Sequence, residues 1–358
     1  MSAKSRRSLA GLVLSAIVSV AGSLHAADAP TESGIDPASV PSVPDEPLYA
    51  APTTFDRIGR IMAPVMLNGQ GPFRFIIDTG ASRSVVSPQL VERLGLEAST
   101  GPRLTIQGAT GAEEVPSVLI ERLEAGDLRM RNVQLPVVAP MVLAGADGIL
   151  GVEGFDRLRI TVDFAADRIS ITRAYRALPA LGGWYKVPVR LRFGRLMIAN
   201  VRVGNVPVKA VIDTGADRTL GNLVLRDALG LGAETHLEPG ETRITGATSV
   251  EEMAHTLAAP TVRFGATTIS GLDITFADLH VFRLWGLERE PALVLGMDVL
   301  GTPSALMFDY RHGELQIRTA HPATQPDSRR QRVARRREPH SLTRALNPRI
   351  RVRPPPSR

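Results

Sequence analysis

The sequence contains no cysteine, so the chain has no disulfide and no thiol nucleophile, and it cannot form a cysteine-ligated zinc site. Its stability must therefore come from a hydrophobic core, which a body of roughly 260 residues is long enough to supply. Three familiar catalytic motifs are also missing, namely the Gly-Lys-Ser/Thr phosphate loop, His-Glu-x-x-His and Gly-x-Ser-x-Gly. His255, His280 and His312 are scattered, and we interpret them as surface or turn residues rather than metal ligands.

The net positive charge of the chain comes from its two ends. Residues 321–358 contain eleven Arg and two acidic residues, and residues 1–26 contain three basic residues and no acidic one. Because the whole chain has a net charge of +6, the segment between the two ends has a net charge of −6. The basic tail has no apolar period and is predicted to be disordered. It is either a solvated tail without a partner or a segment attracted to an anionic envelope surface, and no nucleic acid is expected to bind.

The first 26 residues have the pattern of a secretory signal, with a basic start, an apolar stretch from Leu9 to Leu24, and Ala26 for cleavage. The alternative is an uncleaved membrane anchor, although the stretch is shorter than the usual span of about 20 residues. Residues 27–56 are rich in Pro, Ser, Ala and acid and are predicted to be a flexible lead-in. An exported chain without cysteine fits a bacterial periplasm better than a eukaryotic secretory route.

Two stretches of the body nearly repeat one another. Residues 75–82 and 210–217 each consist of an apolar run that ends in Asp-Thr-Gly-Ala. The run predicts a strand that delivers the Asp, and the Gly lets the backbone turn sharply beside it. Two identical carboxylates on two similar loops, Asp78 and Asp213, indicate a site where paired acids share a proton.

The repeat extends over a whole domain, because four further markers follow each Asp in the same order. The first is a short helical segment, at residues 87–96 and 223–231, and the second is a strand that reaches a glycine turn, at 106–111 and 244–249. The third is an apolar stretch that runs through glycine to an acid, at 148–153 and 293–298, and the fourth is a closing strand, at 160–164 and 306–310. Ser87 as N-cap, Pro88 at the first position and Gly95 as terminator predict the first helix. The chain is thus a duplicated unit with loop insertions.

Together these motifs resemble the retropepsin-like aspartic proteases over both halves of the body. The resemblance implies an all-β fold of two similar closed β-barrel lobes with a short helix each, related by a pseudo-two-fold axis as in the bilobal pepsins. The lobes are predicted at residues 57–175 and 176–320, joined through residues 165–195, in a monomer whose halves pair within one chain. Short runs rich in Val, Ile and Thr, punctuated by Gly, agree with a mostly β fold.

The paired carboxylates determine the expected chemistry. Two carboxylates about 3 Å apart cannot both ionise readily, so they hold one proton between them. The ionised member takes a proton from a water molecule, and the protonated member donates a hydrogen bond to the substrate carbonyl. This chemistry requires neither a metal nor a cofactor. Which of Asp78 and Asp213 has which part stays open, because the protons belong to the pair.

The resemblance also implies roles for the neighbouring residues of each loop. The hydroxyls of Thr79 and Thr214 would bond across to the backbone of the opposite loop, and Gly80 and Gly215 would let the loops approach. The alanines that follow stand where pepsins usually carry a hydroxyl that bonds the carboxylate. Losing that bond disfavours the ionised form, so we expect a less acidic optimum than that of a stomach enzyme.

Substrate contacts are expected from two further places. Asp217 occupies a position that in retropepsins often contacts the substrate backbone, whereas the first half has Ser82 there, so the two sides of the cleft are predicted to be unequal. Two glycine turns are interpreted as flap-like hairpin tips, or alternatively as ordinary β-turns, at Gly108, Ala109, Gly246 and Ala247.

The sequence therefore predicts an exported aspartic endopeptidase that acts on a peptide or protein substrate. One alternative is a peptide-binding protein of the same fold that has lost turnover, although both Asp-Thr-Gly motifs are complete. A carboxylate metal site is the third reading, and it is disfavoured because the two Asp residues have no obvious further ligands.

Overall fold

The computed structural model describes residues 59–98, 102–180, 182–232, 240–265 and 267–319. It also describes the backbone of five short strands, β1 (Leu12–Val13), β2 (Ser19–Val20), β3 (Ala51–Pro52), β4 (Thr54–Phe55) and β27 (Arg351–Arg353). The predicted signal segment, lead-in and tail otherwise lie outside the described residues.

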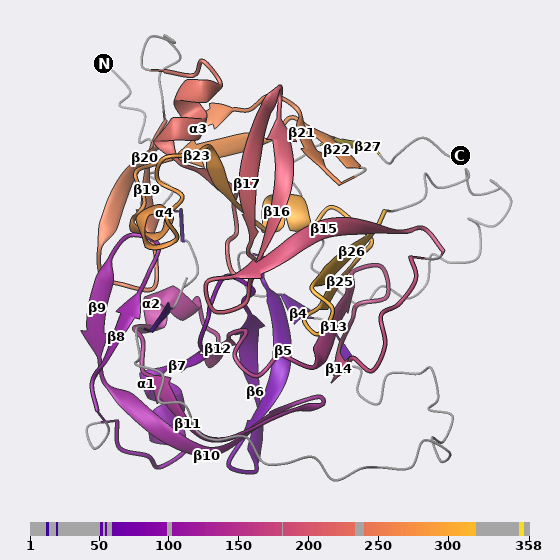
Figure 1. Ribbon diagram of the computed structural model, residues 1–358. Coiled ribbons are helices and arrows are strands. Elements are labelled where there is room, and N and C mark those ends of the chain that lie inside the picture. The colour runs from indigo at the N-terminus through magenta and orange to yellow at the C-terminus, as the bar shows by residue number, and fades with distance from the viewer. Residues whose placement is uncertain are drawn as a thin grey trace, which may run out of the picture.

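The first lobe is a nearly closed barrel, in the lower half of Figure 1. Its main sheet has the order β11-β10-β5-β6-β12-β7, with β4 beside β5, and β8 and β9 form a hairpin. The elements are β5 (Ile61–Leu67), β6 (Gln70–Ile77), β7 (Val85–Val86), α1 (Pro88–Arg93), β8 (Leu104–Gln107), β9 (Ala112–Val115), β10 (Ser117–Ala125), β11 (Leu128–Pro136), α2 (Pro140–Leu143) and β12 (Gly148–Leu150).

The second lobe repeats this plan in the upper half of Figure 1. As β12 lies parallel to β6 and antiparallel to β7, so β24 lies parallel to β17 and antiparallel to β18. The elements are β16 (Leu196–Val203), β17 (Val206–Ile212), β18 (Leu220–Gly221), α3 (Leu223–Ala228), β19 (Gly240–Thr245), β20 (Glu251–Ala258), β21 (Val262–Phe264), β22 (Thr267–Ser270), β23 (Asp273–Phe276), α4 (His280–Leu284), β24 (Ala292–Leu295) and α5 (Met297–Leu300). The predicted all-β, bilobal and duplicated fold is confirmed.

A third sheet joins the lobes. Its strands are β13 (Leu158–Asp163), β14 (Arg168–Arg173), β15 (Trp184–Arg192), β25 (Ala305–Asp309) and β26 (Glu314–Arg318), and β3 adds to the free edge of β14. The two predicted closing strands, β13 and β25, pair antiparallel with each other. Strand β15 pairs with β26 in this sheet and with β16 in the second lobe. Residues 165–195 are therefore more than a connection, because they contribute β14 and β15.

The two helices predicted from the sequence form where the chain provides a cap. The Ser87 hydroxyl accepts a hydrogen bond from the Leu90 amide at 3.0 Å, Pro88 occupies the first turn, and Gly95 takes a left-handed φ of 66° just after the helix. In the second lobe Asn222 caps α3 in the same way, through the Leu225 amide at 2.9 Å. Each lobe therefore has its predicted short helix, and α2, α4 and α5 are further helices of four or five residues, too short to show a helical period.

Short strands also form in two segments that were predicted to be flexible or disordered. Strands β3 and β4 in the lead-in pair with β14 and β5, and β27 in the tail pairs with β22. Each covers backbone groups of its partner strand, which is the physical reason for order there. Strands β1 and β2 pair with β19 and β8. In the described part of the chain, no helix is long and apolar enough to cross a membrane.

Candidate active site

Asp78 and Asp213 lie at equivalent places in the two lobes. Asp78 follows β6 and its amide donates to the Leu150 carbonyl of β12 at 3.1 Å, and Asp213 follows β17 and donates to the Leu295 carbonyl of β24 at the same distance. Both side chains are fully buried. Each Asp is therefore held at the end of a strand that a neighbouring parallel strand keeps in place.

The two threonines connect the loops in a symmetric set of four hydrogen bonds. The Thr79 hydroxyl donates to the Ile212 carbonyl at 2.8 Å, and the Thr214 hydroxyl donates to the Ile77 carbonyl at 2.7 Å. Each hydroxyl also accepts from the amide of the other threonine, at 3.0 and 3.1 Å. The cross-lobe bonds expected from the resemblance are thus present, and all the groups are buried.

The glycines bring the opposing carboxylates together. A Cβ atom at Gly80 would collide with the carboxyl group of Asp213, and one at Gly215 would collide with that of Asp78. The same glycines donate from their amides to their own loop's carboxylate, at 2.9 Å to Asp78 Oδ1 and 2.8 Å to Asp213 Oδ1. Asp213 Oδ1 receives a second bond, from the Ala216 amide at 3.2 Å, so the surroundings of the two acids are not identical.

The remaining oxygens, Oδ2 of Asp78 and of Asp213, are buried and receive no hydrogen bond from a donor in the described residues. Burial raises the pKa of both carboxyls, and the nearby Asp213 carboxyl raises the pKa of Asp78 further, well above its usual range. The Gly80 and Gly215 amides act in the opposite direction, because they stabilise the charged forms. A single proton shared by the two carboxyls satisfies this arrangement.

The two residues predicted to contact substrate lie in different surroundings. Asp217 Oδ1 is buried without a hydrogen-bond partner in the described chain, and burial together with the Asp298 charge raises the Asp217 pKa to about 7, against the opposing charge of Arg218. Ser82 is half-buried, and Gly194 in the β15–β16 turn approaches it so closely that a Cβ there would lie 3.4 Å from the serine Cβ. The two sides of the site therefore differ in charge.

The glycine turns at 108–111 and 246–249 are the tips of the β8–β9 and β19–β20 hairpins, and the two tips meet. Thr110 Oγ1 lies 3.3 Å from Thr248 Oγ1 and donates to the Val250 carbonyl at 2.6 Å. The Ser249 amide donates to a Glu113 carboxylate oxygen at 2.8 Å. The two turns are therefore in contact across the lobes, which isolated surface turns would not be.

Each tip also packs on the opposite lobe. Ala247 belongs to the same buried cluster as Ala81, three residues after Asp78. The Ala109 carbonyl accepts from the Val281 amide in α4 at 3.2 Å, and Gln107 Oε1 lies 2.7 Å from His280 Nε2. His280, interpreted from the sequence as a surface or turn residue, is therefore a contact between a hairpin and the other lobe. Figure 1 shows the β8–β9 hairpin reaching α4 and β19.

Sequence reasoning missed further ionisable groups near the pair. Arg60 is fully buried, and its charge lowers the pKa of Asp78 and Asp213. The Tyr310 hydroxyl is buried without a partner in the described residues, and burial together with the two Asp charges raises its pKa. No local pattern marks either residue, because their closeness to the pair arises only from tertiary packing.

A second pair of acids accepts hydrogen bonds from residues that follow the two Asp-Thr-Gly loops. Glu153 accepts from the Ser84 amide at 2.5 Å, and Asp298 accepts from the Thr219 amide and hydroxyl at 3.0 and 2.7 Å. Both acids end the apolar-Gly markers of the repeat, and that recurrence was the available signal. Burial raises the pKa of Glu153 to about 7 and that of Asp298 to about 6.

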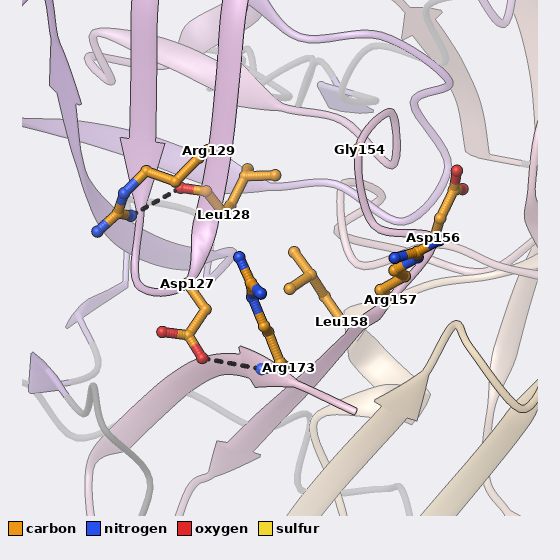
Figure 2. A pocket seen from close by; sticks show the side chains of 8 residues that line it. All are labelled: Asp127, Leu128, Arg129, Gly154, Asp156, Arg157, Leu158 and Arg173. Atoms are coloured by element: carbon orange, nitrogen blue, oxygen red, sulfur yellow. Dashed lines mark hydrogen bonds between the residues drawn. The ribbon is translucent and has the colours of Figure 1, made fainter. Parts of the chain in front are cut away.

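A surface hollow of about 290 Å³ lies away from the paired carboxylates. Its lining comes from the β10–β11 turn, Gly154, residues 156–158 and Arg173, and neither Asp78 nor Asp213 takes part (Figure 2). Asp127 in its wall accepts from the Arg173 amide at 2.9 Å. The hollow is thus a feature separate from the candidate active site.

Two β-barrel lobes that each contribute one buried Asp-Thr-Gly loop to a common centre define the aspartic protease class of architecture. The family model described as Aspartyl protease matches the chain twice, over residues 63–153 and 199–299, which together make up more than half of its length. The chain therefore belongs to the aspartyl protease family and contains its domain in duplicate. None of the curated proteins matches it.

Proposed function

We propose that this protease is an exported endopeptidase in which Asp78 and Asp213 activate a water molecule against a peptide bond. Its membership of the aspartyl protease family supports a protease-type function. The observation that carries the proposal is the closeness of two buried carboxyls whose Oδ2 oxygens receive no hydrogen bond from a donor in the described chain. Such a pair is able to hold one proton and one water between its members.

The proposed reaction uses both protonation states of the pair. The ionised carboxyl removes a proton from the water as its oxygen attacks the peptide carbonyl carbon, and the protonated carboxyl donates to the carbonyl oxygen as charge develops there. The carboxyl that took the water proton then gives it to the amide nitrogen, the C–N bond breaks, and the other carboxyl takes back a hydroxyl proton as the carboxylic acid product forms. The threonines take no chemical part and hold the loops in register.

The test is turnover of a peptide library by the full chain and by two variants. Asp78→Asn and Asp213→Asn are each expected to abolish hydrolysis while the fold remains, because each removes half of the shared-proton pair. A single variant that keeps a tenth of the activity in a clean preparation would contradict the paired mechanism. A wild-type chain that binds a pepstatin-like inhibitor but cleaves no peptide would instead identify a peptide-binding protein of the same fold.

Export is a separate part of the proposal, and it rests on the pattern of residues 1–26. We expect the mature protein to accumulate in the periplasm or outside the cell, with Ala27 near its amino terminus. Mass spectrometry of the purified mature protein checks this. Retention of Met1 or Ser2 in a membrane fraction would show an anchored form.

A further inference from the structure

The residue opposite each catalytic aspartate in the barrel hairpin differs between the two lobes. In the first lobe Met62 pairs with Ile76 across β5 and β6, and the same register continued by two positions sets Arg60 opposite Asp78. In the second lobe Ile198 pairs with Val211, and the same continuation sets Leu196 opposite Asp213. The pseudo-symmetric fold therefore places a cation at one position and an aliphatic side chain at the other.

Both side chains are inside the protein. Arg60 is 0% exposed and Leu196 is 1% exposed. Arg60 Nη1 donates to the Val142 carbonyl of α2 at 3.4 Å, which directs the guanidinium toward the helix that follows β11. A buried guanidinium is always charged, and its field is poorly screened by water.

The charge of Arg60 acts on carboxyls from both lobes. It lowers the pKa of Asp78, Asp213 and Asp217, in each case against the larger effect of burial. Arg60 is the basic side chain among the main influences on the pKa values of the pair in the described part of the chain, and the Tyr310 hydroxyl is another titratable neighbour. Arg218 acts on Asp217, and Arg83 acts on Glu153. Leu196 brings no charge to its side.

We propose that Arg60 is a positioning residue that keeps one carboxyl of the pair ionised, so that the shared-proton state of the site persists into acid solution. The inference rests on the proposed function only for its kinetic readout. The role also gives a physical reason why the two lobes differ here, with Arg60 in one and Leu196 in the other. One buried cation stabilises the single negative charge that the pair needs, whereas two buried cations would favour loss of the shared proton.

The test compares neutral and charged replacements at Arg60 in the full chain. Arg60→Gln keeps a hydrogen-bond donor but removes the charge, Arg60→Met is the second neutral variant should the first not fold, and Arg60→Lys keeps the charge. Leu196→Met is the matched control at the pseudo-symmetric position. The acid limb of the pH profile of kcat/KM is measured for each.

Removing a positive charge raises the pKa of a nearby carboxyl, so the neutral variants should lose activity at a pH higher by about one unit. Arg60→Lys and Leu196→Met should keep the wild-type limb. An unmoved limb in a folded neutral variant overturns the proposal. So does an equal shift in the lysine variant, since that would show a role for the shape of Arg60 rather than its charge.

A second readout does not need turnover. In protein labelled with ¹³C at the Asp carboxyl carbons, the signals lost in the Asp78→Asn and Asp213→Asn variants identify the pair, and their titration reports its ionisation directly. The midpoint of the first ionisation should move upward by about one pH unit in Arg60→Gln and stay in Arg60→Lys. A chain that cleaves no peptide but shows this movement would refute the proposed function and support the role of Arg60. Unchanged midpoints would refute that role whatever the activity.

Discussion

At the scale of single residues, the candidate site depends on groups that do no chemistry. Thr79 and Thr214 each satisfy one carbonyl and one amide of the opposite loop, and all these groups are buried. A buried polar group left without its partner costs more than the bond itself contributes. The position of both aspartates therefore depends on two hydroxyls contributed from opposite lobes.

Thr79→Val should lower both stability and rate. Valine has the shape of threonine but leaves the Ile212 carbonyl and the Thr214 amide without their partner, which we expect to cost on the order of 2–5 kcal/mol in the free energy of unfolding. Thr79→Ser keeps the hydroxyl and is the matched control. Urea unfolding measures the loss, and a valine variant as stable as wild type would contradict the interlocked loops.

Glu153→Gln should change how stability depends on pH. Burial raises the pKa of Glu153 from 4.5 to about 7 in the folded protein, so the folded state holds this proton more tightly than the unfolded state. Between pH 4.5 and pH 7 the unfolded chain loses its proton first, and stability falls as the pH rises through that window. Glutamine does not titrate, and its side chain can still accept from the Ser84 amide.

We therefore expect Glu153→Gln to be more stable than wild type at pH 8 by on the order of 1–3 kcal/mol, with a smaller or reversed difference at pH 5. Glu121→Gln, at an exposed position on β10, is the control for a general effect of charge. Urea unfolding at both pH values provides the comparison. If the free energies of unfolding of wild type and the Glu153 variant differ by the same amount at both pH values, the raised pKa of Glu153 is refuted.

The same scale shows where the sequence stops being informative. Asp78 and Asp213 were predicted because each ends a strand in a repeated local pattern. Arg60 and Tyr310 were not predicted, since a lone Arg before a strand and a Tyr after one have no distinguishing local pattern. Their burial near the pair depends on how both lobes close around them.

At the scale of elements, both glycine turns were predicted, and their contact was not. Hairpins follow from strands that meet at a glycine turn, and such patterns are local. Which other element a hairpin touches depends on the placement of the lobes. For the same reason the pairing of β14 and β15 was not predicted, because the partners β13 and β26 depend on how the lobes are placed.

Thr110→Val should loosen both hairpin tips. The hydroxyl donates to the Val250 carbonyl at 2.6 Å and lies beside the Thr248 hydroxyl, so valine removes direct bonds between the tips. Amide hydrogen exchange at residues 108–111 and 246–250 should quicken by several-fold, while exchange in β6 and β17 stays as in wild type. Thr110→Ser should preserve the wild-type rates, and exchange unchanged in the valine variant would show that the tips are held by other contacts.

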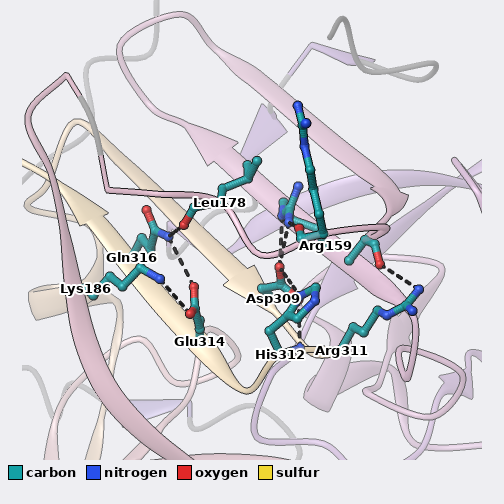
Figure 3. Close-up of polar contacts among 10 residues, drawn as sticks. Arg159, Leu178, Lys186, Asp309, Arg311, His312, Glu314 and Gln316 are labelled. Atoms are coloured by element: carbon teal, nitrogen blue, oxygen red, sulfur yellow. Dashed lines mark hydrogen bonds and ion pairs between the residues drawn. The ribbon is translucent and has the colours of Figure 1, made fainter. Parts of the chain in front are cut away.

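At the scale of the whole molecule, the shared sheet fixes the two halves of one chain to each other. Arg159 of β13 stands opposite Asp309 of β25 and forms an ion pair at 2.7 Å, and the Asp309 side chain is 0% exposed (Figure 3). His312 also contacts Asp309, through Nδ1 at 3.0 Å. The ion pair joins one residue of each closing strand and so favours this register of β13 against β25, and removing either partner by mutation would leave the other as a buried unpaired charge.

Side chains of β26 and of the turn before it also donate hydrogen bonds to residues 174–178, where the chain passes from one lobe to the other. Arg311 donates to the Ala174 carbonyl at 3.1 Å, and Gln316 donates to the Leu178 carbonyl at 3.0 Å (Figure 3). The crossover thus follows one path along the sheet. This favours pairing of the lobes within a chain over exchange of lobes between two chains.

We therefore expect one chain to form one active site. Specific activity should stay constant as the enzyme is diluted well below the micromolar range, because the tether keeps the lobes at a high effective concentration. Residues 57–175 expressed alone should be inactive when dilute, since they hold one carboxylate and expose the edge of β13 that β25 normally covers. Adding residues 180–320 should restore some turnover by rebuilding that pair of strands. Activity of the full chain that falls steeply on dilution, with sedimentation showing a dimer that dissociates in step, would instead show that each half pairs with a second copy.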